Sequence, residues 1–175
     1  MADEIVPDDK DWTWVLERPC LECGFDATTV EPGAVADLIR ENAAQWDVVL
    51  EASADELRTR RRPDRWSTLE YAAHVRDVNR LYLERLQMML DLDDPLYPNW
   101  DQDVTAVTDR YGAQDPAVVR VELAASAEEL AEAFDGLTDE QWSRPGRRSD
   151  GAAFTVDTFA LYMVHDPIHH LRDVT

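Results

Sequence analysis

Four segments of the sequence carry apolar residues at the three- and four-residue spacing of an amphipathic helix, and this pattern limits the possible folds most. The segments cover residues 32–52, 67–90, 115–136 and the stretch from 155 onward. Ser67 and Glu70 form a capping box, and Asp115 before Pro116 is a typical helix start. The last segment is so apolar that its pattern also suits a buried strand. We predict an all-α protein, a four-helix bundle with a long crossover between its second and third helices.

The residues before the bundle differ in character. Residues 1–30 are rich in proline, aromatic and acidic residues, so we predict an irregular N-terminal extension followed by a bundle domain over residues 31–175. In the extension, Cys20 and Cys23 form a C-x-x-C followed by glycine, which suits one half of a zinc knuckle. The chain has no second C-x-x-C, and no thioredoxin-like pattern surrounds this one. A structural or incidental role is favoured, and a site completed by a second subunit stays open.

Charge and hydropathy argue against several classes of partner. The net charge is −20, from 37 acidic and 17 basic residues. Nucleic acids and anionic membranes need a cationic surface, so neither is expected as a partner. No apolar run approaches the roughly 18 residues of a membrane-spanning helix, and the acidic N-terminus lacks the pattern of a signal peptide. We therefore expect a cytoplasmic protein.

The histidines are concentrated near the end of the chain. Three of the four lie within residues 165–170. On a helix, His165 and His169 are one turn apart on the same face, the spacing at which two imidazoles bind one metal ion. His74 is expected to face the bundle interior from the second helix. A lone buried histidine is more often a core residue, and the last histidines alone would suit a polar helix end. Together they favour a metal site inside the bundle.

Two stretches resemble the motifs of the DinB-like metalloprotein family. They are RWSTLEYAAHVRDVNRLYLERL, at residues 65–86, and HDPIHHLRDV, at residues 165–174. The resemblance implies an up-down-down-up bundle, often a homodimer. It also implies one divalent metal ion, zinc or nickel, bound by His74, His165 and His169. Related proteins include thiol S-transferases that use mycothiol or bacillithiol and a mycothiol-dependent maleylpyruvate isomerase, so a small-molecule substrate and a low-molecular-weight thiol such as mycothiol are implied.

Pro167 departs from the family pattern because it lies between the two expected ligands of the last helix. Proline cannot donate a hydrogen bond to the preceding turn, and it disfavours helical geometry at Asp166. A kink would keep His165 and His169 usable as a pair. A fresh helix starting at Asp166 would instead turn His170 inward in place of His169.

The expected ligands determine the expected chemistry. Three neutral imidazoles leave a metal ion an open coordination position, which is typical of catalytic sites. A thiol that enters this position loses its proton, and water is activated by the same principle. Glu70 and Asp77, one turn from His74, are candidate catalytic residues that would orient the imidazole or act as a base. Asp166 and Asp173 are weaker candidates, and all four carboxylates also suit a solvated surface.

Three kinds of function remain open from the sequence. The favoured one is a metal-dependent thiol S-transferase or isomerase, with a metal-dependent hydrolase as the nearest enzymatic alternative. The second is a metal- or small-molecule-binding stress protein without turnover, and the third is a structural dimer. In the long connection, Tyr97, Trp100 and Tyr111 would either cover a metal site or pack across the end of the bundle.

Overall fold

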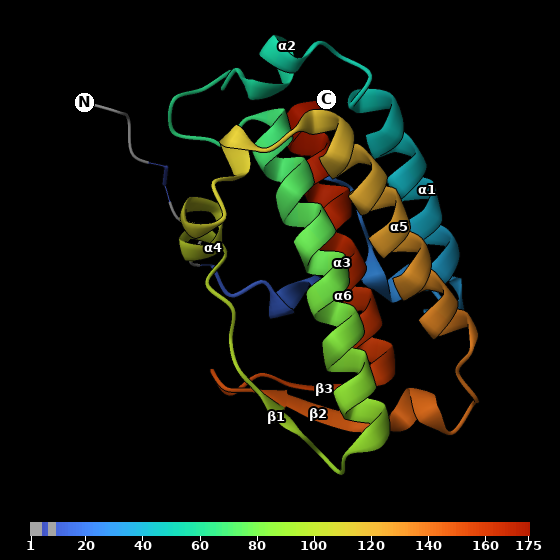
Figure 1. The fold of residues 1–175 in the computed structure, drawn as a ribbon. Helices are drawn as coiled ribbons and strands as arrows, with labels where there is room; N and C mark the ends of the chain where they lie inside the picture. The colour runs from blue at the N-terminus through green and yellow to red at the C-terminus, as the bar shows by residue number, and fades with distance from the viewer. Residues whose placement is uncertain (1–4, 7–9) are drawn as a thin grey trace.

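The computed structural model, which describes residues 5–6 and 10–175, contains four long helices arranged as a bundle (Figure 1). These helices are α1 (Val35–Val49), α3 (Thr68–Asp91), α5 (Pro116–Asp135) and α6 (Val156–Val174). Figure 1 shows α1 and α6 running in one direction and α3 and α5 in the other, so the up-down-down-up topology is confirmed. Two short helices, α2 (Ala54–Arg58) and α4 (Gln102–Thr108), lie in the connections. Residues 1–4 and 7–9 of the predicted extension lie outside the described residues.

The helix starts predicted from sequence are present. Ser67 Oγ accepts a hydrogen bond from the backbone N–H of Glu70, and the Glu70 carboxylate accepts one from the N–H of Ser67, at 3.3 and 2.7 Å. At α5, the carboxylate of Asp115 accepts from the N–H of Ala117 at 2.9 Å. Each cap satisfies backbone donors that have no partner within the helix.

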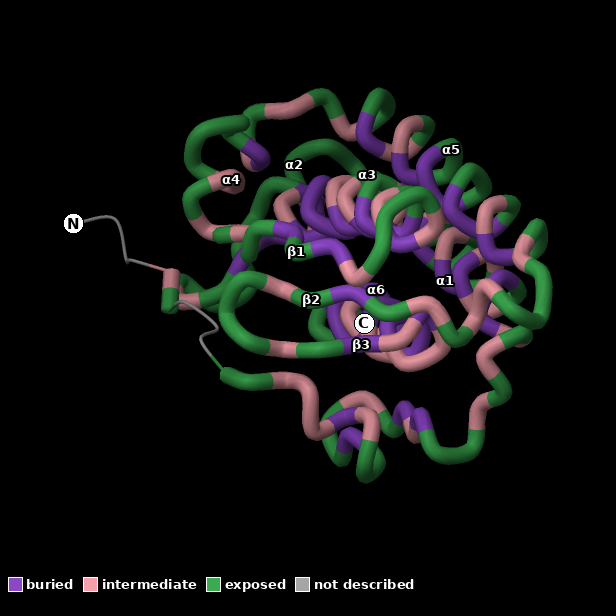
Figure 2. The backbone as a smooth tube through the Cα atoms, turned by 90° about the horizontal axis from the view of Figure 1, so that it is seen from below, coloured by how far each residue is buried: buried purple, intermediate pink, exposed green. Residues whose placement is uncertain are grey.

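Apolar side chains from the four long helices fill the interior, and Figure 2 shows buried residues along these helices. The largest fully buried ones include Trp46, Leu69, Leu86, Leu130, Phe159 and Met163. Each such side chain contributes about 1.5–3 kcal/mol when it leaves water. Among the described residues, no helix is both long and apolar enough to cross a membrane.

A small sheet at one end of the bundle was not predicted from the sequence. Its strands are β1 (Leu96–Tyr97), β2 (Pro145–Arg148) and β3 (Ala153–Thr155), in the order β1-β2-β3. The first pair is parallel and the second antiparallel. The strands are two to four residues long, and β2 consists of proline, glycine and arginine, which indicate a turn rather than a strand. The sheet ties the long crossover to the hairpin that precedes α6.

The N-terminal segment folds onto the bundle through short 3-10 helices, Thr13–Leu16 and Ala27–Thr29, and buries Val15 and Cys20. The first of these packs against α6. Helix α6 continues through Pro167, so no new helix begins at Asp166.

Candidate functional site

All four histidines line one cavity of about 490 Å³. It is bordered by α3, α6, the N-terminal segment and the crossover between α3 and α5. Its aromatic and cationic lining residues include Trp12, Tyr82, Trp100, Tyr162, Arg85 and Arg148. The size falls within the range of pockets that hold small ligands. The side chains that could hold a metal ion separate into two groups.

The first group, here called the carboxylate cluster, consists of His74, Asp166 and His170. The carboxylate of Asp166 lies between the two imidazoles, with 3.2 Å from Oδ2 to His74 Nε2 and 3.1 Å from Oδ1 to His170 Nε2. His74 comes from α3, and the other two come from one face of α6, one turn apart. The three ligand atoms lie within 4.8 Å of one another, so one ion would reach all of them.

The charges of the carboxylate cluster balance one another. Burial alone would raise the pKa of Asp166, but His170 and His74 hold it well below its ordinary value. Burial opposes a charge on His170, yet Asp166 and Asp173 raise its pKa to about 9. Burial lowers the pKa of His74. Without a metal ion, neutral His74 therefore lies beside an Asp166–His170 ion pair.

Neighbouring residues fix the two imidazoles of this cluster. Asp173 Oδ2 lies 3.0 Å from His170 Nδ1, which leaves Nε2 of that ring facing Asp166. Trp100, in the crossover, stacks on His74 with ring centroids 5.2 Å apart and parallel planes. The buried Nδ1 of His74 has no hydrogen-bond partner in the described structure.

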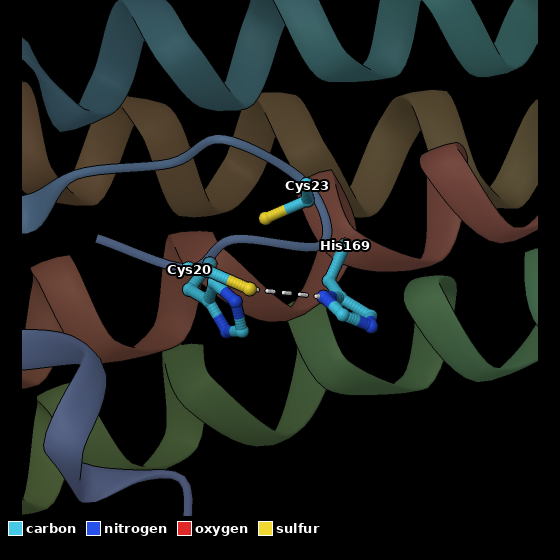
Figure 3. A group of neighbouring side chains, drawn as sticks. Cys20, Cys23 and His169 are labelled. Atoms are coloured by element: carbon cyan, nitrogen blue, oxygen red, sulfur yellow. Dashed lines mark hydrogen bonds between the residues drawn. The ribbon is translucent and has the colours of Figure 1, made fainter.

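The second group, here called the thiol cluster, consists of Cys20, Cys23, His165 and His169. Cys20 Sγ lies 3.6 Å from His169 Nδ1 (Figure 3). Burial lowers the pKa of His165 to about 4, so this imidazole is neutral, and burial raises the pKa of the Cys23 thiol to about 11. Both cysteines are free.

The expected ligand set is therefore divided between the two clusters. His165 and His169 share one face of α6 as expected, but they meet the cysteines, whereas His74 meets Asp166 and His170. Helix α6 contains two pairs with four-residue spacing, His165 with His169 and Asp166 with His170, and the second pair is shifted by one residue. One residue turns a helix by about 100°, so the two pairs face different neighbours.

Glu70 and Asp77, the candidate catalytic residues, direct their hydrogen bonds elsewhere. Glu70 caps α3 and accepts from Arg60 at 2.6 and 3.0 Å. Asp77 accepts from Arg76 and from the hydroxyl of Tyr111, the latter at 2.6 Å. These contacts outweigh the effect of burial and lower the pKa of both carboxyls. Both residues therefore support α3 and its packing.

Two parts of the site were missed or undervalued in the sequence. By sequence Asp166 is a weaker candidate than Glu70 and Asp77, although its four-residue spacing from His170 is a usable signal. A second usable signal is the combination of C-x-x-C at residues 20–23 with H-x-x-x-H at residues 165–169, a ligand spacing typical of Cys₂His₂ zinc sites. Of the three crossover aromatics, Trp100 lines the cavity, while Tyr97 and Tyr111 are buried in the bundle.

Comparison with known proteins identifies the family. Residues 37–174 match the profile of the DinB superfamily, and among curated proteins no match is found. A solved structure with a similar fold is YfiT from Bacillus subtilis, described as a probable metal-dependent hydrolase with an unusual four-helix bundle topology. The TM-score is 0.73 at 17% identity, over 97% of this chain and 89% of that chain. Because the family profile matches most of the sequence, the chain belongs to the DinB superfamily.

Proposed function

We propose that this protein is a metal-dependent enzyme that activates a low-molecular-weight thiol in the cavity, as an S-transferase or isomerase. The observation that carries the proposal is the carboxylate cluster, where two helices bring two imidazoles and a carboxylate together at the cavity wall. Two imidazoles and one carboxylate are a ligand set of catalytic zinc sites, in which a further position stays open.

The residues present fit a divalent ion. His74 is neutral and fully buried, and its Nε2 faces the Asp166 carboxylate, where a neutral imidazole could bind a metal ion. Asp166 is ionised, and its side chain keeps 34% exposure toward the cavity. Asp173 would orient His170 from behind, a common arrangement for metal-binding histidines. A zinc or nickel ion would therefore gain His74, Asp166 and His170 as ligands.

The ion would supply a Lewis acid that lowers the pKa of a thiol or water entering its open position. Because Asp166 is an anion, a metal ion bound by His74, Asp166 and His170 would have one unit less positive net charge than an ion bound by three neutral imidazoles. His170 would bind the ion through Nε2, and its Nδ1–H would donate to Asp173. Trp100 shields His74 from water on one side.

The cavity also supports recognition of an acidic small molecule. Arg85 lines it and is buried, and its Nε has no hydrogen-bond partner in the described structure. Arg148 lines it as well, although its guanidinium is already held by Asp150 and Tyr162. A carboxylate on the thiol or on its electrophilic partner would satisfy Arg85.

The test begins with the full-length protein, stripped of metal and reloaded with zinc or nickel. We would measure consumption of thiols in the presence of a panel of electrophiles, and hydrolysis of activated esters without thiol. We expect metal-dependent thiol consumption that is lost in His74→Ala. Ester hydrolysis alone would favour the hydrolase described for YfiT, and metal binding without turnover would favour a binding protein.

The ligand set is tested in the same experiment with two further variants. Asp166→Asn should lose the cavity metal, whereas His165→Ala should keep it. The opposite result would favour the set implied by the family resemblance, His74, His165 and His169.

We also infer a homodimer in the cytoplasm. The family resemblance supports the dimer, and two free cysteines suit a reducing compartment. Light scattering on purified protein tests the first inference, and cell fractionation tests the second.

A further inference from the structure

The four ligand atoms of the thiol cluster lie within 4.8 Å of one another. In a tetrahedral zinc site with Zn–S of about 2.3 Å and Zn–N of about 2.0–2.1 Å, sulfur and nitrogen are about 3.6 Å apart. Cys20 Sγ and His169 Nδ1 are separated by 3.6 Å. The pair thus already has the separation that a shared zinc ion requires.

The local backbone presents both sulfurs to α6. The N–H of Gly24 donates to the carbonyl of Cys20 at 2.7 Å, and the N–H of Cys20 donates to the carbonyl of Phe25 at 2.8 Å. These bonds close a tight turn, which requires the left-handed conformation of Gly24 at φ +80°. Figure 3 shows the turn over α6, with the Cys20 sulfur directed at His169.

Burial makes the cluster costly without an ion. Cys20 is 1% exposed and His165 is 4% exposed. The Nε2 atom of His165 is buried without a hydrogen-bond partner in the described structure. The contact between Cys20 and His169 partners Nδ1 of His169 and leaves His165 Nε2 unpartnered. A disulfide between the cysteines would give His165 Nε2 no partner, whereas one zinc ion would take all four side chains as ligands.

We propose that Cys20, Cys23, His165 and His169 form a second metal site, a closed Cys₂His₂ zinc site that fastens the N-terminal segment to α6. Four protein ligands leave no open position, so the site is structural rather than catalytic. Trp12 packs against both imidazoles, at 5.2 and 5.0 Å between ring centroids. Because Trp12 also lines the cavity, the zinc site would hold one cavity wall in place. This proposal does not depend on the proposed function.

The test is cobalt substitution in the full-length protein, purified without a histidine tag and stripped with a chelator. Cobalt bound by two thiolates in tetrahedral geometry gives thiolate-to-cobalt charge transfer and intense visible bands. We expect this signature at one equivalent, displaced by zinc. It should disappear in Cys20→Ser and Cys23→Ser and persist in His74→Ala, so loss of the cavity metal would be distinguishable from loss of this site.

Glu22→Gln is the matched control, because Glu22 lies between the two cysteines in sequence and its Oε2 is 3.5 Å from His169 Nε2. We expect it to leave the cobalt signature unchanged. Cobalt binding without thiolate absorption would overturn the proposal. So would a protein purified without reductant that carries a Cys20–Cys23 disulfide and no zinc.

A second measurement covers the case in which the cysteine variants fail to fold. In the unmodified protein, zinc should slow the reaction of both thiols with a thiol reagent, and chelation should restore it. Equal reaction rates with and without zinc would overturn the proposal.

Discussion

Both clusters include two residues of the same helix, α6, but they differ in their exposure to the cavity and in their charge. The carboxylate cluster joins Asp166 and His170 to His74 of α3, whereas the thiol cluster joins His165 and His169 to the two cysteines of the N-terminal segment. Asp166 keeps 34% exposure, while Cys20 has 1%. One residue of helical rotation thus separates a cluster whose three members all line the cavity from a cluster whose two cysteines do not line it.

The difference also predicts what each cluster does when metal is absent. In the carboxylate cluster, Asp166 pairs with protonated His170, so the group is electrostatically satisfied. In the thiol cluster, burial keeps His165 neutral and lowers the pKa of His169, so no comparable ion pair forms; His165 Nε2 has no partner in the described structure, as is also true of His74 Nδ1. A metal ion should therefore matter most for stability at the thiol cluster and for chemistry at the carboxylate cluster.

The largest expected effect is the loss of stability when zinc is removed. Zinc at 1,000 times its Kd stabilises the protein that binds it by about 4 kcal/mol. For a chain of this size, that corresponds to a fall in Tm of roughly 8–16 °C on chelation. Thermal unfolding followed by circular dichroism would measure it. If Cys20→Ser loses as much Tm on chelation as the parent, the thiol cluster is not the stabilising site.

Asp166→Asn should weaken metal binding to the carboxylate cluster by more than the roughly 100-fold that loss of an orienting residue costs, because it removes an anionic ligand and the partner of both imidazoles. Isothermal titration with zinc or nickel would measure the affinity. The thiolate absorption of the cobalt form should stay unchanged. A variant that changed both signals together would show that the two clusters behave as one site.

A smaller effect is expected for Asp173→Asn. The amide can still accept a hydrogen bond from His170 Nδ1, but it lacks the charge that raises the pKa of His170. We expect about tenfold weaker binding at the carboxylate cluster, at the lower end for residues that orient a metal ligand. Affinity equal to that of the parent would argue against an orienting role for Asp173.

The fold could be predicted because its signals are local. The apolar spacing, the capping box at Ser67 and the cap at Asp115 each depend on residues within one or two helical turns. The sheet could not, because β1 has only two residues and pairs with β2 about 50 residues away, and β2 has the composition of a turn. The segment that follows β1 carries Trp100, which stacks on His74.

The site was predicted only in its residue types. Helical spacing correctly places His165 and His169 on one face, and it places Asp166 and His170 on another with equal weight. Which face meets His74 depends on the rotation of α6 about its axis, and packing of the whole bundle sets this rotation. The partner of Cys20 lies 149 residues away in sequence, so only the folded chain shows it.

The smallest expected effect concerns Glu70, and measuring it distinguishes a structural role of Glu70 in α3 from a catalytic role. Glu70→Gln removes the ion pair with Arg60 but keeps an acceptor for the cap, so we expect a loss of about 1 kcal/mol. The contacts of Glu70 lower its pKa. Its contribution should therefore be complete above the ordinary pKa of about 4.3 and disappear as the pH falls through the lower folded value.

Urea unfolding of parent and variant between neutral and acidic pH would measure this loss, and the two stabilities should converge in acid. Glu56→Gln is the matched control because Glu56 occupies the same position in the capping box of α2 and forms no ion pair with arginine in the described structure. The stability lost in Glu56→Gln should be smaller than that lost in Glu70→Gln. Metal affinity at the carboxylate cluster should be unchanged in both variants. If Glu70→Gln instead abolished turnover while stability and metal affinity stayed at parental values, Glu70 would be a catalytic residue, and the carboxylate cluster would extend further along α3 than its contacts indicate.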